Sequence, residues 1–251
     1  MGVGKNKPQM AKEVALVCAG AKFDPNIHVR QIYQNLQQHC TDFRLTVFTD
    51  KGRGLDLPGV RLIQLPDWNL TPRQLWWYKL YIHAQHEWTG PVLYMDLDTI
   101  IINNIDKFWY YQQGDFCICQ DFNRQFIRDY AVSNSSIMRF DPGTTYEMYE
   151  NFVSNIEKHL RQFRGDQDYV TDWFKNRPGK TWWPREWAMS YKWEIKHGGS
   201  RIGGLDVKYP DDYYHPEHEE VIPDTCSIVV FHGKPDPYDT DFGKKRLTVP
   251  I

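Results

Sequence analysis

Residues 91–102 read P-V-L-Y-M-D-L-D-T-I-I-I, and this stretch organises the rest of the chain. The short apolar run 92–95 ends at a polar break, which is typical of a buried β-strand. Asp96 and Asp98 follow directly. Because open α/β sheets bind ligands outside the carboxyl ends of their strands, two acids at this place predict a ligand site. Desolvating two carboxylates is costly, so we expect them to meet a divalent cation.

The D-x-D spacing occurs three times, at 96/98, 166/168 and 239/241. Aspartate is a common residue, so this spacing also arises by chance. Only the first pair follows an apolar strand, and that context makes Asp96 and Asp98 our candidate metal ligands. The alternative is a charged strand end that only caps the segment after it.

Composition indicates an ordinary globular protein. The chain has 251 residues, 41% apolar and 25% charged, which fits one large domain. A net charge of −2 argues against a broad nucleic-acid or anionic-membrane surface. No apolar run approaches membrane-spanning length and the first residues lack a signal-peptide core, so we expect a cytoplasmic protein with no membrane span. Cys117 and Cys119 share one face of an expected strand, which favours a buried core over a zinc site.

The order of expected elements indicates the fold class. Residues 1–12 are polar and are expected to form a flexible tail, with one domain over 13–251. Strands are expected at 13–18, 43–50 and 59–65, with a helix from Pro25 between the first two. This β-α-β-β opening predicts a layered α/β domain with a largely parallel sheet. The later apolar runs predict further strands at 92–95, 115–120, 133–140 and 225–231.

Two helix starts carry polar side chains of interest. T-P-R-Q at 71–74 predicts a helix that carries Lys79, which either extends outward to solvent or reaches an anion beside the acid pair. G-D-Q-D at 165–168 opens another helix. An aspartate there is often only a cap, but this run is denser than capping requires, so we expect Asp166 and Gln167 to hold a polar substrate. Tryptophans at 182–193 are candidates for the floor of a sugar site.

A third set of chemical groups follows the last expected strand, where F-H-G-K-P occupies 231–235. His232 adds a nitrogen ligand to the two carboxylates, and mixed oxygen and nitrogen ligation suits Mn²⁺ better than Mg²⁺ or Ca²⁺. Lys234 supplies a positive charge, and Gly233 allows close approach of the backbone. A metal ion and a lysine together suit a diphosphate, whose charge as a leaving group the metal stabilises.

These motifs resemble those of the metal-dependent GT-A glycosyltransferases, in the glycogenin- and galactosyltransferase-like group (family 8-like). The similarity covers about residues 13–238 and rests on the order of V-L-Y-M-D-L-D, S-N-S-S-I-M-R-F, G-D-Q-D and F-H-G-K-P. W-W-Y-K-L at 76–80 and S-Y-K-W at 190–193 also look similar to uncharacterised bacterial and phage proteins of this type. The resemblance implies one Rossmann-like GT-A domain, with a mostly parallel mixed sheet flanked by helices.

The resemblance also implies a chemistry. It implies transfer of a hexose, with retention of configuration, from a nucleotide-diphosphate sugar, UDP-linked, to a carbohydrate, lipid-linked or protein acceptor, with Mn²⁺ or alternatively Mg²⁺. Relatives carry a second basic residue after the Lys-Pro pair, where this chain has Asp236. The implied site residues are Asp96, Asp98 and His232 for the metal; Cys18, Ala19, Phe23 and Leu97 for the nucleotide; Lys79, Gly233 and Lys234 for phosphate; and Asn134, Asp166 and Gln167, as catalytic candidates, around the transferred sugar.

Three alternative functions fit parts of the sequence. M-D-L-D-T at 95–99 also fits a haloacid-dehalogenase-like phosphatase with Asp96 as nucleophile, although such chains carry that strand near the N-terminus and three strands precede it here. A nucleotidyltransferase needs a glycine-rich basic loop after the first strand, and A-G-A-K at 19–22 is a poor version. The third alternative is a non-catalytic sugar- or nucleotide-binding protein.

Overall fold

The structure is a computed structural model that describes residues 11–50, 54–125, 127, 130–196 and 222–247. Its strands are β1 (Lys12–Cys18), β2 (Phe43–Thr49), β3 (Arg61–Gln64), β4 (Val92–Met95), β5 (Thr99–Ile101), β6 (Phe116–Gln120), β7 (Ser133–Phe140), β8 (Lys180–Trp182), β9 (Ala188–Ser190) and β10 (Ile228–Val230). Its α-helices are α1 (Arg30–His39), α2 (Lys107–Tyr110), α3 (Tyr146–Ser154), α4 (Ile156–Gln162), α5 (Asp166–Trp173) and α6 (Asp241–Lys244). Short 3₁₀ or π turns complete it: η1 (Pro25–Val29), η2 (Leu75–His83), η3 (Phe122–Gln125), η4 (Arg185–Trp187), η5 (Tyr191–Ile195) and η7 (Pro237–Asp239).

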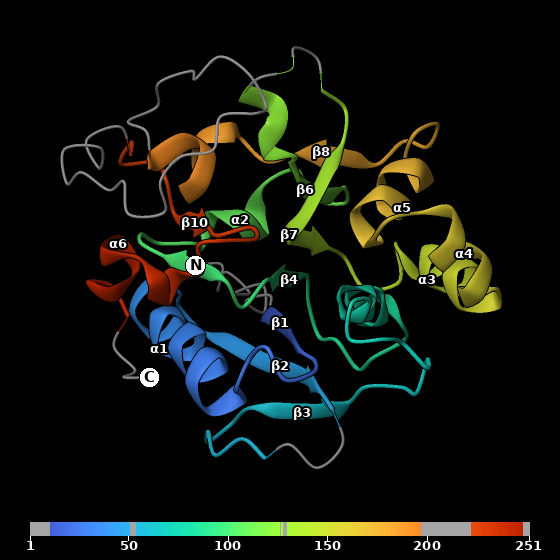
Figure 1. The fold of residues 1–251 in the computed structure, drawn as a ribbon, viewed down its shortest axis with the longest axis horizontal. Coiled ribbons are helices and arrows are strands. Elements are labelled where there is room, and N and C mark those ends of the chain that lie inside the picture. Colours follow the sequence, from blue (N-terminus) through green and yellow to red (C-terminus); the bar gives the residue numbers. More distant parts are fainter. Residues whose placement is uncertain (1–10, 51–53, 126, 128–129, 197–221, 248–251) are drawn as a thin grey trace, which may run out of the picture.

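A seven-stranded mixed sheet forms the centre, in the order β3-β2-β1-β4-β7-β6-β8 (Figure 1). Strands β3, β2, β1 and β4 are parallel neighbours, β7 runs antiparallel to both β4 and β6, and β8 is parallel to β6. The sheet is therefore mixed and mostly parallel, as expected. Strand β4 is the middle strand, so the acid pair at its carboxyl end lies at the centre of the sheet edge.

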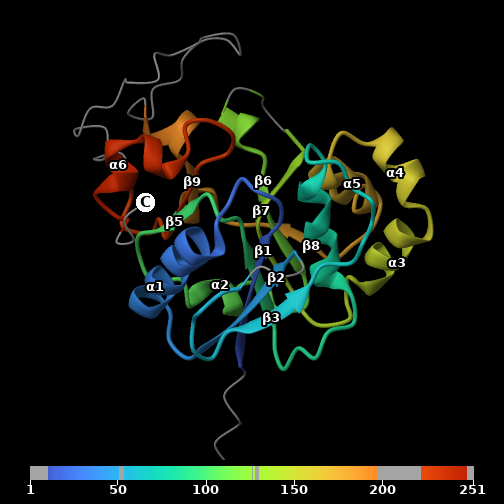
Figure 2. The ribbon, with the colours of Figure 1, turned by 60° about the horizontal axis from the view of Figure 1, so that its bottom comes forward.

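The two faces of the sheet are covered by different helices, on opposite sides of it in Figure 2. In β4, Leu93 and Met95 pack into a core with α1 and α2, while Val92 and Tyr94 pack into a core with η2, α3 and α5. This alternation follows from the period of two in a strand, and both faces are apolar because both are covered. The layered α/β fold is thereby confirmed.

A second, three-stranded sheet in the order β5-β10-β9 places the C-terminal segment beside the acid pair. Strand β10 runs antiparallel to β5, with Val230 opposite Thr99. One residue further on, the Phe231 N–H donates to the Asp98 carbonyl at 2.9 Å. This register brings His232, 134 positions after Asp98 in the chain, to the end of β4.

Some boundaries differ from the sequence expectations. Lys12, which we assigned to the tail, begins β1 and is buried. The Thr71 N–H donates to the Gln74 side chain at 3.1 Å, as in a capping box, but the helix that follows is 3₁₀ and begins at Leu75. Helices α3 and α4 are separated at Asn155, whose side chain accepts from the Lys158 N–H and caps α4. Residues 1–10 and 197–221 lie outside the described part.

The cysteines are free and buried, including Cys117 and Cys119 on β6, so their assignment to the core is confirmed. Within the described residues, none of the helices is both long enough and apolar enough to span a membrane.

Candidate functional site

Two adjoining cavities open at the carboxyl ends of β1 and β4. The larger, of about 460 Å³, is lined mainly by residues with polar or charged side chains, and the smaller, of about 410 Å³, lies toward β1 and has mostly apolar walls. Both are lined by Trp76, Lys79, Asp96, Asp98 and Gly233. The acid pair therefore stands at the junction between an apolar and a polar compartment.

Lys79 points inward to the acid pair rather than outward to solvent. Its ammonium donates to the Asp96 carboxylate at 2.9 Å and to the Ser135 hydroxyl at 3.2 Å. The Tyr94 hydroxyl donates to the other oxygen of Asp96 at 2.6 Å. Burial lowers the pKa of Lys79, but the charges of Asp96 and Asp166 outweigh burial, and the net pKa is raised. Lys79 is therefore a fixed positive charge in the cavity wall.

Asp98 has different surroundings. Burial and the neighbouring charge of Asp96 raise the pKa of Asp98 to about 7, against the opposing effect of Lys22 and Lys79. The two carboxylates therefore repel each other across a desolvated site. A cation between them would remove that repulsion, which is the electrostatic condition for a metal site.

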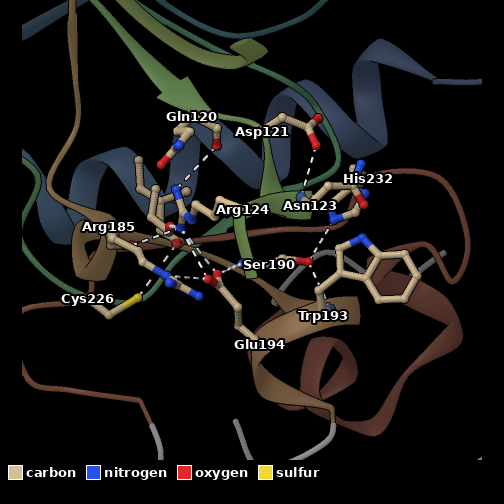
Figure 3. A network of polar contacts seen from close by, with 12 residues as sticks. Gln120, Asp121, Asn123, Arg124, Arg185, Ser190, Trp193, Glu194, Cys226 and His232 are labelled. Carbon is tan, nitrogen blue, oxygen red and sulfur yellow. Dashed lines mark hydrogen bonds and ion pairs between the residues drawn. The ribbon is translucent and has the colours of Figure 1, made fainter. Parts of the chain in front are cut away.

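His232 forms a hydrogen bond with Ser190 at the end of β9, in the network shown in Figure 3. Its Nε2 lies 2.7 Å from the Ser190 hydroxyl, and its ring stacks on Phe122 with centroids 5.0 Å apart. Burial, with a smaller effect of Lys192, lowers the pKa of His232 to about 4. The imidazole is therefore neutral at pH 7, the form in which histidine ligates a metal.

The residues present fit a divalent cation by type. Asp96, Asp98 and His232 line the same cavity, and two carboxylates with an imidazole form a mixed oxygen and nitrogen donor set. Among the described residues, no three His, Cys, Asp or Glu side chains are grouped so that they could hold a metal ion as they stand. Lys79 donates to Asp96, and the Ser190 hydroxyl lies 2.7 Å from Nε2 of His232.

The polar cavity brings together the three candidates around a transferred sugar: Asn134, Asp166 and Gln167 all line it. The Asn134 side chain accepts from the Ser136 N–H at 3.0 Å, which fixes its orientation. Asp166 is buried, and burial raises its pKa while Lys79 opposes the shift. Its Oδ2 is buried without a hydrogen-bond partner, so it remains able to accept one.

The apolar cavity contains Ala19, Phe23 and Leu97, three of the nucleotide candidates. The loop that carries the first two turns sharply at Gly20, whose φ of +68° suits glycine. A Cβ at Gly20 would also lie 2.3 Å from the Leu75 side chain, so the loop packs directly against η2. Cys18 is fully buried in the core and is not one of the described residues that line either cavity.

Lys234 also lies away from the cavities, as far as the described residues define their walls. Its ammonium donates to Asp236 at 2.6 Å and to Asp239 at 3.2 Å, and its side chain is 72% exposed. Gly233, just before it, does line both cavities.

Several wall residues were absent from our sequence candidates. Trp76 lines both cavities and is 44% exposed, whereas the tryptophans at 182, 183, 187 and 193, the expected sugar floor, are not among the described lining residues. Asp121, Asn123 and Tyr130 come from the loop after β6. The signal for Trp76 was its spacing of three from Lys79, which places both on one face of a 3₁₀ helix.

Solved structures of glycosyltransferases share this architecture. An active-site mutant of LgtC has a TM-score of 0.64 at 11% identity, covering 95% of this chain and 97% of that one. The galactosyltransferase LgtC with donor and acceptor sugar analogues has a TM-score of 0.61, with the same identity and coverage. The glycosyltransferase GlyE of Streptococcus pneumoniae TIGR4 has a TM-score of 0.58 at 11% identity, covering 90% of this chain and 56% of that one.

No protein-family model matches the sequence, and no curated protein matches it either. At 11% identity the likeness to LgtC and GlyE establishes the fold. The chain therefore has the α/β architecture of GT-A glycosyltransferases, as the sequence predicted, with the candidate site at the carboxyl edge of its central sheet.

Proposed function

We propose that this chain is a metal-dependent, family 8-like glycosyltransferase. Its donor would be a nucleotide-diphosphate sugar, UDP-linked, and its acceptor a carbohydrate, a lipid-linked sugar or a protein. The observation that carries this proposal is the pair of cavities joined at Lys79, Asp96 and Asp98. An apolar compartment suits a base and ribose, a polar one suits a sugar, and charged groups between them suit a diphosphate.

In this proposal Asp96, Asp98 and His232 hold the divalent cation, Mn²⁺ or alternatively Mg²⁺. When bound, the cation would neutralise the charge that develops on the diphosphate as it leaves. Lys79 adds a buried positive charge beside the same group and donates a hydrogen bond to Asp96. Tyr94, by donating to Asp96, fixes that carboxylate in one orientation.

The remaining polar residues would orient the sugar. Asn134, Asp166 and Gln167 line the polar cavity, and Asp166 has a buried carboxylate oxygen without a hydrogen-bond partner. Such groups bind sugar hydroxyls and hold the anomeric carbon toward an acceptor, which lowers the barrier by positioning. We place Asp166 or Gln167 beside the anomeric carbon and propose that transfer retains its configuration. We include in this proposal the similarity of residues 76–80 and 190–193 to bacterial and phage proteins of the same type.

The phosphatase alternative is disfavoured by the place of Asp96 in the chain. Such phosphatases carry the nucleophilic strand near the N-terminus, whereas β1, β2 and β3 precede β4 here.

The test is the melting temperature in the presence of a panel of nucleotide-diphosphate sugars, with and without Mn²⁺. Because a ligand of the folded state stabilises it by mass action, about 2.7 kcal/mol at a hundredfold excess over Kd, one donor should raise the melting temperature. The rise should require Mn²⁺ and be lost in Asp98→Asn. Asp172→Asn, on the exposed side of α5, is the matched control and should behave as wild type.

Two results would contradict the proposal. If no donor shifts the melting temperature, the nucleotide-sugar site is wrong. If a donor binds but neither transfer nor release of free nucleotide diphosphate follows, the chain is a binding protein rather than an enzyme.

A further inference from the structure

The turn after His232 packs against the loop after β1, at the rim of the apolar cavity. The Tyr238 ring lies edge-on to His28 with centroids 5.2 Å apart, and His28 lies edge-on to Phe23 at 5.0 Å. The Lys22 ammonium lies over the Phe23 ring, 4.5 Å from its centroid. Lys22 and Phe23 both line the apolar cavity. A lysine is thus positioned where these two segments meet.

Lys22 lies between two carboxylates. Its ammonium is 3.8 Å from Asp98, one of the acid pair, and 3.3 Å from Asp236 in the C-terminal turn. Both distances are longer than the 2.6 Å of Lys234 to Asp236 and the 2.9 Å of Lys79 to Asp96. Its side chain is 52% exposed. Lys22 is therefore directed to the metal-site end of the cavity, where two long ion pairs and the face of the Phe23 ring hold its ammonium.

Lys234 has the opposite arrangement. It is bound at short range by Asp236 and Asp239 on the side of η7, and its side chain is more exposed than that of Lys22. To reach a diphosphate at the acid pair it would have to leave both partners. Lys22 would have to give up only its contact with Asp236, whose carboxylate carries the same sign of charge as a phosphate.

We propose that Lys22 takes the role that the resemblance assigns to Lys234. Lys22 binds the diphosphate of the donor, and Asp236 holds Lys22 in place until phosphate oxygens replace the Asp236 carboxylate. This inference rests on the proposed function and deepens it. It accounts for Asp236, which stands where the resemblance implies a second basic residue. In this chain the second positive charge comes instead from the loop after β1. The diphosphate would then lie between Lys22, Lys79 and the cation held by Asp96 and Asp98.

The structural alternative is an exposed lysine in two weak surface ion pairs, which contribute little to stability and nothing to binding. The two cases differ in what a neutral replacement does to ligand binding. A lost charge-assisted hydrogen bond weakens binding, whereas a lost surface ion pair leaves it unchanged.

The experiment measures Kd by calorimetry for UDP, GDP, CDP and ADP and for the matching nucleoside monophosphates, in the presence of Mn²⁺. The proteins are wild type, Lys22→Gln, Lys234→Gln and Asp236→Asn, each first checked for an unchanged melting temperature without nucleotide. For the nucleoside diphosphate that binds best, we expect Lys22→Gln to raise Kd about tenfold or more and to weaken its salt dependence. Lys234→Gln should raise it less than threefold, and Asp236→Asn should lower it.

The preference for diphosphate over monophosphate should fall in Lys22→Gln, because the lysine is assigned to the phosphate group and not to the base. If Lys22→Gln binds as wild type while Lys234→Gln is weakened, Lys234 is the diphosphate ligand and this inference is wrong, with the proposed function intact. If wild type binds none of the four diphosphates, both are wrong.

Discussion

Asp96 and Asp98 are two positions apart, yet their environments differ. Asp96 is held by Lys79 and Tyr94, while burial and the charge of Asp96 raise the pKa of Asp98 to about 7. Asp96 is therefore paired with a cation at short range, whereas Asp98 is the carboxylate whose ionised form the site destabilises. This asymmetry follows from the side chains that η2 and β4 direct to the same point, and the D-x-D spacing alone does not reveal it.

The buried Lys79–Asp96 pair should contribute to the stability of the folded chain. Lys79→Met removes a buried cation and leaves the Asp96 carboxylate with Tyr94 as its hydrogen-bond donor. Breaking a buried pair at one partner costs about 3–5 kcal/mol, because a desolvated charge is left uncompensated. Urea unfolding should show a loss of that size at pH 7.

The matched variant for this pair is the double replacement Lys79→Met with Asp96→Asn. It removes both charges, so it should recover part of the lost stability, and the two single effects should not add. Single and double variants that are equally destabilised would mean that the loss comes from packing, with no contribution from the unpaired charge.

At the scale of elements, η2 shows why part of the site was hard to predict. Three of its buried residues, Trp77, Leu80 and His83, recur every third position, and Trp76 and Lys79 on the cavity side are also three apart. In a 3₁₀ helix residues three apart lie above one another, whereas an α-helix would have spread them around the axis. The capping pattern at 71–74 predicts a helix but not its type, so the direction of Lys79 could not be decided from sequence.

The segment 177–196 was unpredictable for a different reason. Its strands β8 and β9 have three residues each, too few to show an alternating pattern, and they pair with β6 and β10, far away in the chain. The long apolar strands of the central sheet were predictable because each is buried on both faces. His232 could be named from its neighbours in sequence, but its support by Ser190 could not.

A buried ion pair fixes this segment under the site. Arg124 on η3 donates to the Glu194 carboxylate at 3.3 Å and to the carbonyls of Arg185 and Ala188 at 3.1 Å (Figure 3). Glu194 in turn accepts from the N–H of Ser190, the residue behind His232. The pair therefore links the loop after β6 to the histidine.

We expect Arg124→Met to lower the unfolding free energy by about 3 kcal/mol, because Glu194 loses its buried cation and keeps only the half-exposed Arg185, at 3.1 Å, as a described cationic partner. The control is Arg161→Met, which removes an exposed pair with Glu157 on α4 and should change stability by less than about 0.5 kcal/mol. Chemical denaturation of both variants gives the comparison. Equal effects would show that burial of the Arg124 pair carries no energetic weight.

At the scale of the whole molecule, the site lies where the two sheets meet. The large sheet supplies the acid pair at the end of β4, and the small sheet supplies His232 through the pairing of β10 with β5. The sequence predicted the strands of the large sheet other than β8 and the acid pair at the end of β4, and it also named the histidine. It could not predict the second sheet, because pairing between segments over 120 residues apart leaves no local pattern.

His83 contacts three parts of the fold, so its protonation should affect the stability of the whole molecule. Its ring contacts Phe116 of β6 and Phe140 of β7, and its Nδ1 lies 2.9 Å from the Thr145 hydroxyl at the start of α3. Burial, with a smaller effect of His86, lowers the pKa of His83 from 6.5 to about 3. Between those values the unfolded chain binds one more proton than the folded chain.

Below pH 6.5 the unfolding free energy should therefore decrease as the pH decreases, by about 1.4 kcal/mol per pH unit for this one group. The contribution is fully present above that value and is lost as the pH falls toward 3. His83→Gln, which cannot titrate, isolates the effect: the gap between wild type and variant in urea unfolding should be constant from pH 7 to 8. Below pH 6 wild type should lose stability faster than the variant, and parallel curves down to pH 4.5 would show that His83 does not titrate on unfolding.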